Sequence, residues 1–213
     1  MIESSNLPSA IRVLIVDDHP VMRHGLSSAL SRESGMELVG EAVNGEDAIA
    51  KFRALLPSVT LMDLQMADTD GLKAIASIRS EYPDANIVVL TSYPGDARIM
   101  RALSLGATSY LLKSAAIEEI VRAIRASVAG RHVIGTDVAH ELTRHIGREV
   151  LTHRELDVLR LVAGGHSNRE IAGLLVVSEE TIKSRMRSIM GKLAASDRAH
   201  AVMIAVKRGF IDP

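Results

Sequence analysis

Residues 11–20 read IRVLIVDDHP and decide the fold. The first six residues form a short apolar, β-branched run, which is typical of a buried strand, and the run ends at the acidic pair Asp17 and Asp18. Apolar residues then recur at helical spacing over 20–32. A buried strand that leads directly into a helix is the repeating unit of a parallel α/β sheet.

The same unit recurs along the first 130 residues. We predict further strands at 36–42, 58–62, 86–90 and 108–112, each followed by a helix, at 46–56, 71–81, 96–104 and 116–129. Five successive units predict a five-stranded, parallel, doubly wound sheet of the flavodoxin-like kind, covered by helices on both faces. Ligands of such sheets bind beyond the carboxyl ends of the strands, at the topological switch point.

The pattern changes after Gly130. Residues 131–148 are predicted to be a linker with one short helix near 137–145, and four helices without a strand follow, at 152–163, 167–175, 178–193 and 197–208. Thr152 with Glu155, and Ser167 with Glu170, have the spacing of capping boxes. We therefore predict an α/β domain at 1–130, a linker at 131–148 and a small all-α domain at 149–213.

The composition excludes several classes of protein. The chain has no cysteine, so disulfides, thiolate metal sites and a cysteine nucleophile are excluded. We find no signal peptide and no apolar run near the roughly 18 residues of a membrane span, and we expect a cytoplasmic protein. Residues 1–134 contain 13 basic and 16 acidic residues, a net charge of −3, and residues 135–213 contain 12 basic and 10 acidic residues, a net charge of +2. The second part therefore tolerates a polyanion better than the first.

Side chains that could bind a ligand or take part in a reaction follow the predicted strands. Three carboxylates, Asp17, Asp18 and Asp63, need a cation among them, and hard oxygen ligands suit Mg²⁺. Thr91 and Lys113 supply a hydroxyl and an ammonium group at the ends of two further strands. Each residue alone has an ordinary explanation, such as a helix cap or a solvated lysine. Together they suit phosphoryl transfer to a carboxylate, with Asp63 in mid-sheet as the nucleophile.

The segments RVLIVDDHP, LMDLQM followed by Asp70-Gly71, VVLTS and GATSYLLK resemble the receiver domain of two-component response regulators over about residues 10–130. The resemblance implies that Asp63 is the phosphoacceptor and that Thr91 and Lys113 contact the phosphoryl group. It also implies a switch residue and a set of Mg²⁺ ligands: Tyr110 as the switch, and Asp17, Asp18, Asp63 and the backbone carbonyl of Gln65 as the ligands. Ala67 and Ser114 depart from the family, which usually has proline at both positions.

The segment 178–193, SEETIKSRMRSIMGKL, predicts an amphipathic helix. Its apolar face carries Ile182, Met186, Ile189 and Leu193, and basic residues gather elsewhere on it: Lys183, Arg185, Arg187 and Lys192. An ordinary solvated surface would explain a basic face equally well. The short helix and tight turn before it favour a helix-turn-helix.

Residues 149–210 resemble the DNA-binding domain of NarL/FixJ-type regulators, which carry a LuxR-type helix-turn-helix. The resemblance implies that 179–193 is the recognition helix and that Lys183, Ser184 and Arg187 contact DNA. The last helix, 197–208, serves dimerisation in this family, but its apolar run at 201–206 could equally be core.

The sequence thus predicts a transcription regulator that receives a phosphoryl group from a sensor histidine kinase on Asp63, and that binds promoter DNA as a homodimer. It predicts no enzyme beyond catalysis of its own phosphorylation and dephosphorylation. Two alternatives stay open. A haloacid-dehalogenase-like phosphatase would need a second acidic residue where Gln65 stands, and a phosphorylation-independent regulator would keep the receiver only for dimerisation.

Overall fold

The structure is a computed structural model, and it describes residues 10–66, 71–92, 95–144 and 151–211. The described residues form two compact units. The first comprises those within 1–92 and 99–140, and the second those within 93–98 and 141–213. Among the described residues no helix is long and apolar enough to cross a membrane.

The first unit is built on a parallel sheet with the strand order β2-β1-β3-β4-β5-β6. The reversal of order between β1 and β3 is a topological switch point. The strands are β1 (Ile11–Val16), β2 (Met36–Ala42), β3 (Val59–Asp63), β4 (Ile87–Thr91), β5 (Ser109–Leu112) and β6 (Val133–Ile134).

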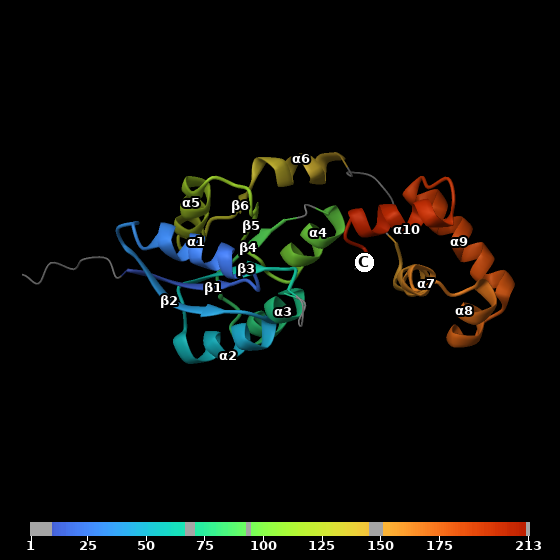
Figure 1. Cartoon of the computed structure of the whole chain (residues 1–213), viewed down its shortest axis with the longest axis horizontal. Coiled ribbons are helices and arrows are strands. Elements are labelled where there is room, and N and C mark those ends of the chain that lie inside the picture. The colour runs from blue at the N-terminus through green and yellow to red at the C-terminus, as the bar shows by residue number, and fades with distance from the viewer. Residues whose placement is uncertain (1–9, 67–70, 93–94, 145–150, 212–213) are drawn as a thin grey trace, which may run out of the picture. The chain divides into compact units, whose positions relative to one another are not determined.

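Helices cover both faces of this sheet (Figure 1). The helices between residues 20 and 144 are α1 (Pro20–Leu30), α2 (Gly45–Leu55), α3 (Gly71–Glu81), α4 (Asp96–Ser104), α5 (Ile117–Val128) and α6 (Thr136–Arg144). Figure 1 shows α1 and α5 on one side of the sheet and α2 and α3 on the other. Alternate strand residues such as Val13, Ile15 and Leu61 pack against Leu26 of α1 and Ile124 of α5 in one aliphatic cluster.

The doubly wound parallel fold is confirmed, but the predicted number of strands is wrong. A sixth strand, β6, pairs with β5 through Val133 and Ile134, inside the range predicted as a linker. Two residues are too few to give a periodic pattern, which is why the sequence did not reveal this strand. The short helix expected near 137–145 is α6.

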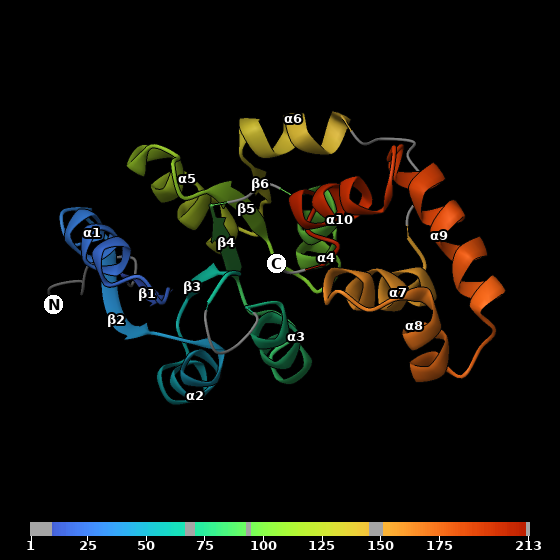
Figure 2. The same ribbon diagram turned by 45° about the vertical axis from the view of Figure 1, so that its right-hand side comes forward.

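The second unit is built on four helices, α7 (His153–Ala163), α8 (Asn168–Leu175), α9 (Glu179–Leu193) and α10 (Arg198–Lys207). Both predicted capping boxes are present: the side chain of Thr152 accepts from the Glu155 amide, and that of Ser167 accepts from the Glu170 amide. Figure 2 shows α8 and α9 joined by their short turn. Their apolar faces pack with α7 and α10 around one core, which contains Ile182, Met186, Ile189 and Leu193 as predicted.

Candidate functional site

The acidic residues predicted to converge do so at the switch point. Asp17 and Asp18 follow β1, and Asp63 ends the neighbouring strand β3. Ligand atoms of Asp17, Asp18, Asp63 and also His19 all lie within 4.8 Å of one another. Asp17 and Asp63 are almost completely buried, at 2% and 1% exposure, so water screens their mutual repulsion poorly.

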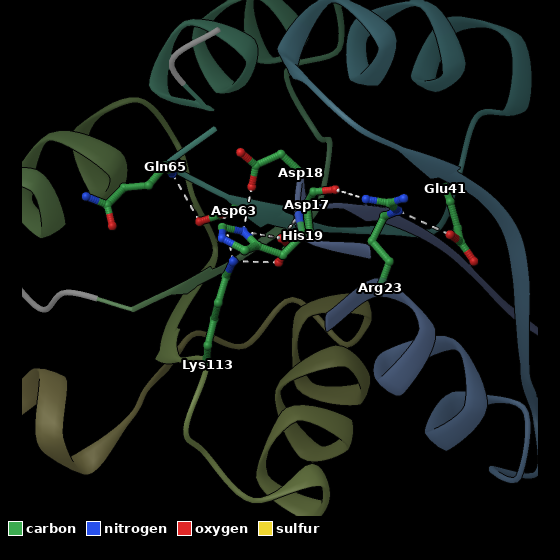
Figure 3. A network of polar contacts seen from close by, with 8 residues as sticks. All are labelled: Asp17, Asp18, His19, Arg23, Glu41, Asp63, Gln65 and Lys113. Atoms are coloured by element: carbon green, nitrogen blue, oxygen red, sulfur yellow. Dashed lines mark hydrogen bonds and ion pairs between the residues drawn. The ribbon is translucent and has the colours of Figure 1, made fainter. Parts of the chain in front are cut away.

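Lys113, which follows β5, supplies a positive charge to this cluster (Figure 3). Its Nζ lies 2.6 Å from Oδ2 of Asp17 and 2.7 Å from Oδ2 of Asp63. The backbone N–H of Lys113 donates to the carbonyl of Thr91, which fixes the start of the loop after β5. One ammonium group therefore bridges the acidic residues of two strands.

The protonation equilibria reflect this crowding. Burial raises the pKa of Asp63, and the hydrogen bond from Lys113 and the Gln65 amide oppose the rise without cancelling it. Burial would lower the pKa of Lys113, but its hydrogen bonds to Asp17 and Asp63 outweigh burial and raise the pKa. The ionised form of Asp63 is therefore less stable in this site than in water, and a further cation nearby would stabilise it.

The remaining predicted residues lie around Asp63. The backbone N–H of Gln65 donates to Oδ1 of Asp63 at 3.0 Å. Thr91 and Tyr110 are fully buried on the neighbouring strands β4 and β5. Because Thr91 pairs with Leu112, two residues beyond Tyr110, the side chains of Thr91 and Tyr110 lie on the same face of the sheet.

The two departures from the family do not remove any of these groups. Ala67 lies outside the described residues. Ser114 follows Lys113 through a trans peptide bond, since the described chain contains no cis peptide.

The sequence reasoning missed two residues beside the cluster. Nδ1 of His19 lies 2.6 Å from Oδ1 of Asp18, and the His19 amide donates to Oδ1 of Asp17. Arg23 of α1 donates to the backbone carbonyl of Asp17. His19 directly follows the acidic pair, so its position in the sequence could have indicated that it belongs to the site. Arg23 lies six residues beyond Asp17, and only the position of α1 shows that its side chain reaches back to Asp17.

A pocket adjoins the cluster at His19 and Lys113. It has a volume of about 550 Å³ and is lined by these two residues together with apolar residues of α1 and α5.

In the second unit, the structure places the predicted DNA-contacting residues on the solvent face of α9. Lys183, Ser184 and Arg187 are exposed. Lys183 pairs with Glu179 at 3.1 Å, and Arg187 pairs with Glu180 at 3.1 Å. Exposed pairs of this kind are weak, so a polyanion can replace the glutamates as the partner of these cations.

Lys192, which the sequence grouped with the basic residues of this helix, has a different environment. Its Nζ lies 2.8 Å from Oε2 of the buried Glu155 on α7. Glu155 also accepts hydrogen bonds from Ser188 of α9 and from Thr152. Lys192 therefore ties α9 to α7, and it belongs to the framework of the helical unit.

The fold and the site define a class of protein: a flavodoxin-like α/β unit with an acidic cluster and a lysine at its switch point, joined to a helix-turn-helix. Comparison with known proteins agrees with both parts. Residues 13–125 match the response regulator receiver domain, and residues 149–205 match the bacterial regulatory proteins of the luxR family. The chain belongs to the response regulator family, in its LuxR-type branch.

Similar proteins match over nearly their whole length. The response regulator protein VraR of Staphylococcus epidermidis is 39% identical over 207 residues, which cover 95% of this chain and 99% of that protein. The structure of response regulator ChrA of a heme-sensing two-component system is 32% identical, with a TM-score of 0.57, over 95% of this chain and 100% of that one. RcsB of Salmonella enterica serovar Typhimurium, bound to promoter P1flhDC in the presence of phosphomimetic BeF₃⁻, is 28% identical, with a TM-score of 0.74, over 93% and 99%.

The protein is thus a phosphorylation-controlled, DNA-binding transcription regulator. Because both parts of the chain match response regulators, the alternative of a haloacid-dehalogenase-like phosphatase is rejected.

Proposed function

We propose that Asp63 is the phosphoacceptor and that a sensor histidine kinase is the donor. The observation that carries this proposal is the burial of Asp63 at the switch point, within 2.7 Å of the Lys113 ammonium group and beside Asp17 and Asp18. An oxygen of Asp63 attacks phosphorus, the bond from phosphorus to the histidine nitrogen of the donor breaks, and the imidazole leaves and takes up a proton.

The donor set of this site fits Mg²⁺. Carboxylate and carbonyl oxygens are its preferred protein ligands, and the carboxylates of Asp17, Asp18 and Asp63 already lie close enough to share one ion. The backbone carbonyl of Gln65 completes the proposed ligands. When bound, the ion supplies positive charge that offsets the repulsion between the carboxylates and the incoming phosphoryl oxygens.

The side chains of the protein position the phosphoryl group and neutralise the charge on its oxygens. Lys113 releases one of its two carboxylate partners and binds a phosphoryl oxygen, and the hydroxyl of Thr91 donates to another. Tyr110 shares a sheet face with Thr91, so a shift of Thr91 toward the phosphoryl group changes the space available to the tyrosine ring. A population shift between two receiver states then alters dimerisation and promoter binding.

For the second unit we propose that α9 is the recognition helix and that Lys183, Ser184 and Arg187 contact DNA. Their exposure on α9 after the turn from α8 supports this assignment. The RcsB structure on promoter DNA supports promoter binding by this chain, because the two proteins match over most of their length. Active regulators with a helix-turn-helix bind two half-sites as dimers, so we propose a homodimer.

The domain limits also remain proposals: a receiver at 1–130, a linker at 131–148 and the DNA-binding domain at 149–213. We further propose a cytoplasmic protein that catalyses its own phosphorylation and dephosphorylation and no other reaction.

The proposal is tested by incubating the full chain with acetyl phosphate and Mg²⁺. One hydroxylamine-sensitive phosphate per chain is expected, and Asp63→Asn and Asp63→Ala should not acquire it. Equal labelling of these variants would refute the assignment of Asp63. A labelled wild-type protein whose DNA affinity does not change would instead favour the phosphorylation-independent regulator.

A further inference from the structure

The β1–α1 connection is held from one side by an arginine that the chemistry above does not use. Nη1 of Arg23 donates to the backbone carbonyl of Asp17 at 2.8 Å, and Nε of Arg23 lies 3.4 Å from Oε2 of Glu41 on β2. The Arg23 side chain is only 15% exposed. Figure 3 shows Arg23 and Glu41 on one side of Asp17, with Asp63 and Lys113 on the other.

This connection needs such support because it carries two of the three acidic side chains. Only residues 17–19 separate β1 from α1, and the Asp17 and Asp18 carboxylates crowd that of Asp63 within 4.8 Å. Like charges at this separation repel strongly in a buried site, and the repulsion acts to spread the connection apart.

The backbone of Asp17 is fixed at both ends. Its N–H donates to the carbonyl of Ala42 on β2, at 3.1 Å, and its carbonyl accepts from Arg23. The first bond continues the sheet, whereas the second depends on one side chain. Loss of Arg23 would therefore free the carbonyl end of Asp17, and with it the direction of the two carboxylates.

The ion pair with Glu41 keeps the Arg23 side chain in this position. A guanidinium group beside three carboxylates would otherwise form a bidentate pair with one of them and compete with a metal ion. Glu41 offers a carboxylate on the opposite side of the connection. Its own backbone carbonyl accepts a hydrogen bond from Lys51 of α2, so β2 is tied down where Glu41 lies.

We propose that Arg23 is a positioning residue of the metal pocket: it holds the Asp17 carbonyl so that Asp17 and Asp18 direct their carboxylates to Mg²⁺, and Glu41 keeps it there. This inference rests on the proposed function, because it concerns the Mg²⁺ site assigned above.

The direction of the effect separates positioning from simple electrostatics. Removing a positive charge near an acidic cluster would by Coulomb's law tighten the binding of a cation. Removing a group that orients metal ligands weakens binding, typically by about 10–100-fold. Arg23→Met removes the charge and the donor together and keeps the apolar stem, so the two explanations predict opposite signs.

The experiment measures Mg²⁺ affinity of the full chain by isothermal titration calorimetry, with melting curves recorded in the absence of Mg²⁺. Arg23→Met is expected to bind Mg²⁺ about 10–100-fold more weakly. Glu41→Gln is expected to weaken binding less, and to add nothing to Arg23→Met, because both act through one contact. Arg12→Met is the matched control, since Arg12 also donates to a backbone carbonyl, that of Leu56, at the other end of β1. Its Mg²⁺ affinity should equal that of the wild type.

Unchanged or tighter Mg²⁺ binding by Arg23→Met would overturn the inference, as would an equal loss in Arg12→Met. If Arg23→Met does not fold, Arg23→Leu replaces it, because leucine also lacks the charge and the donor, and a wild-type affinity in that variant would likewise overturn the inference. Asp18→Ala in the same titration separates this failure from that of the proposed function. If Asp18→Ala binds Mg²⁺ as well as the wild type, the metal site itself is wrong; if only Asp18→Ala loses binding, the site stands and the positioning by Arg23 is refuted.

Discussion

Replacing Glu155 by Gln should destabilise the helical unit at neutral pH and should make its stability less dependent on pH. Glu155 is only 6% exposed. Burial opposes its ionisation, but hydrogen bonds from Lys192, Thr152 and Ser188 outweigh burial and lower the pKa of Glu155 to about 2 from the usual 4.5. Gln keeps the length of the side chain and can still cap α7, so the substitution removes chiefly the charge.

The sign and size of the effect follow from that pKa. A carboxyl group whose pKa is lower in the folded state stabilises the fold above the unfolded pKa, and loses this effect as the pH falls through the folded pKa. The shift corresponds to about 3 kcal/mol at pH 7, of which about 2 kcal/mol is lost by pH 3. The difference in stability between wild type and Glu155→Gln should therefore shrink by about 2 kcal/mol between pH 6 and pH 3.

Urea titrations of the full chain provide the assay. Tyr82 and Tyr110 belong to the first unit and Tyr93 does not, so in a Tyr93→Phe background tyrosine fluorescence follows the first unit, while circular dichroism at 222 nm follows both units. Glu170→Gln is the matched control, because Glu170 occupies the same position of a capping box but is exposed. It should change stability little. A difference between wild type and Glu155→Gln that stays constant from pH 6 to pH 3 would refute the reasoning.

Three further predictions concern other parts of the chain. A Cβ on Gly71 would lie 2.2 Å from the backbone oxygen of Asp63, so Gly71→Ala should displace that strand end and slow phosphorylation by acetyl phosphate about 10–100-fold; a wild-type rate would contradict this. Val176 has a φ of 53° and is 89% exposed, so Val176→Asn should relieve strain without loss of packing and raise the free energy of unfolding by about 1 kcal/mol in urea titrations. Arg187→Ala should weaken DNA binding. If Arg187 contacts a phosphate, the salt slope of binding should fall by about one unit; if it contacts a base, about 1–3 kcal/mol of binding free energy should be lost on the preferred site. Ile182→Ala should instead lower the free energy of unfolding by about 2–5 kcal/mol, because Ile182 is buried. Unaltered affinity and salt slope in Arg187→Ala would remove that residue from the interface.

The sequence predicted those features that have a regular period or a fixed place at a strand end. The strand β1 and the acidic pair after it needed only the apolar run of 11–16, and the buried face of α9 needed only the spacing from Ile182 to Leu193. Features that depend on contacts between distant segments could not be predicted. Arg23 reaches back to Asp17 across the turn into α1, and β6 is defined by its partner β5 rather than by its two residues.

Two of the buried carboxylates, those of Asp63 and Glu155, show why burial alone does not mark a functional group. Both have a lysine within hydrogen-bonding distance, Lys113 and Lys192 respectively. Glu155 also accepts from Thr152 and Ser188, so its pKa falls and its ionised form stabilises the fold. Asp63 shares its lysine with Asp17, so burial prevails and its pKa rises. A buried anion that its surroundings satisfy stabilises the fold, whereas one left short of positive charge would gain from a further cation, as the proposed Mg²⁺ site requires.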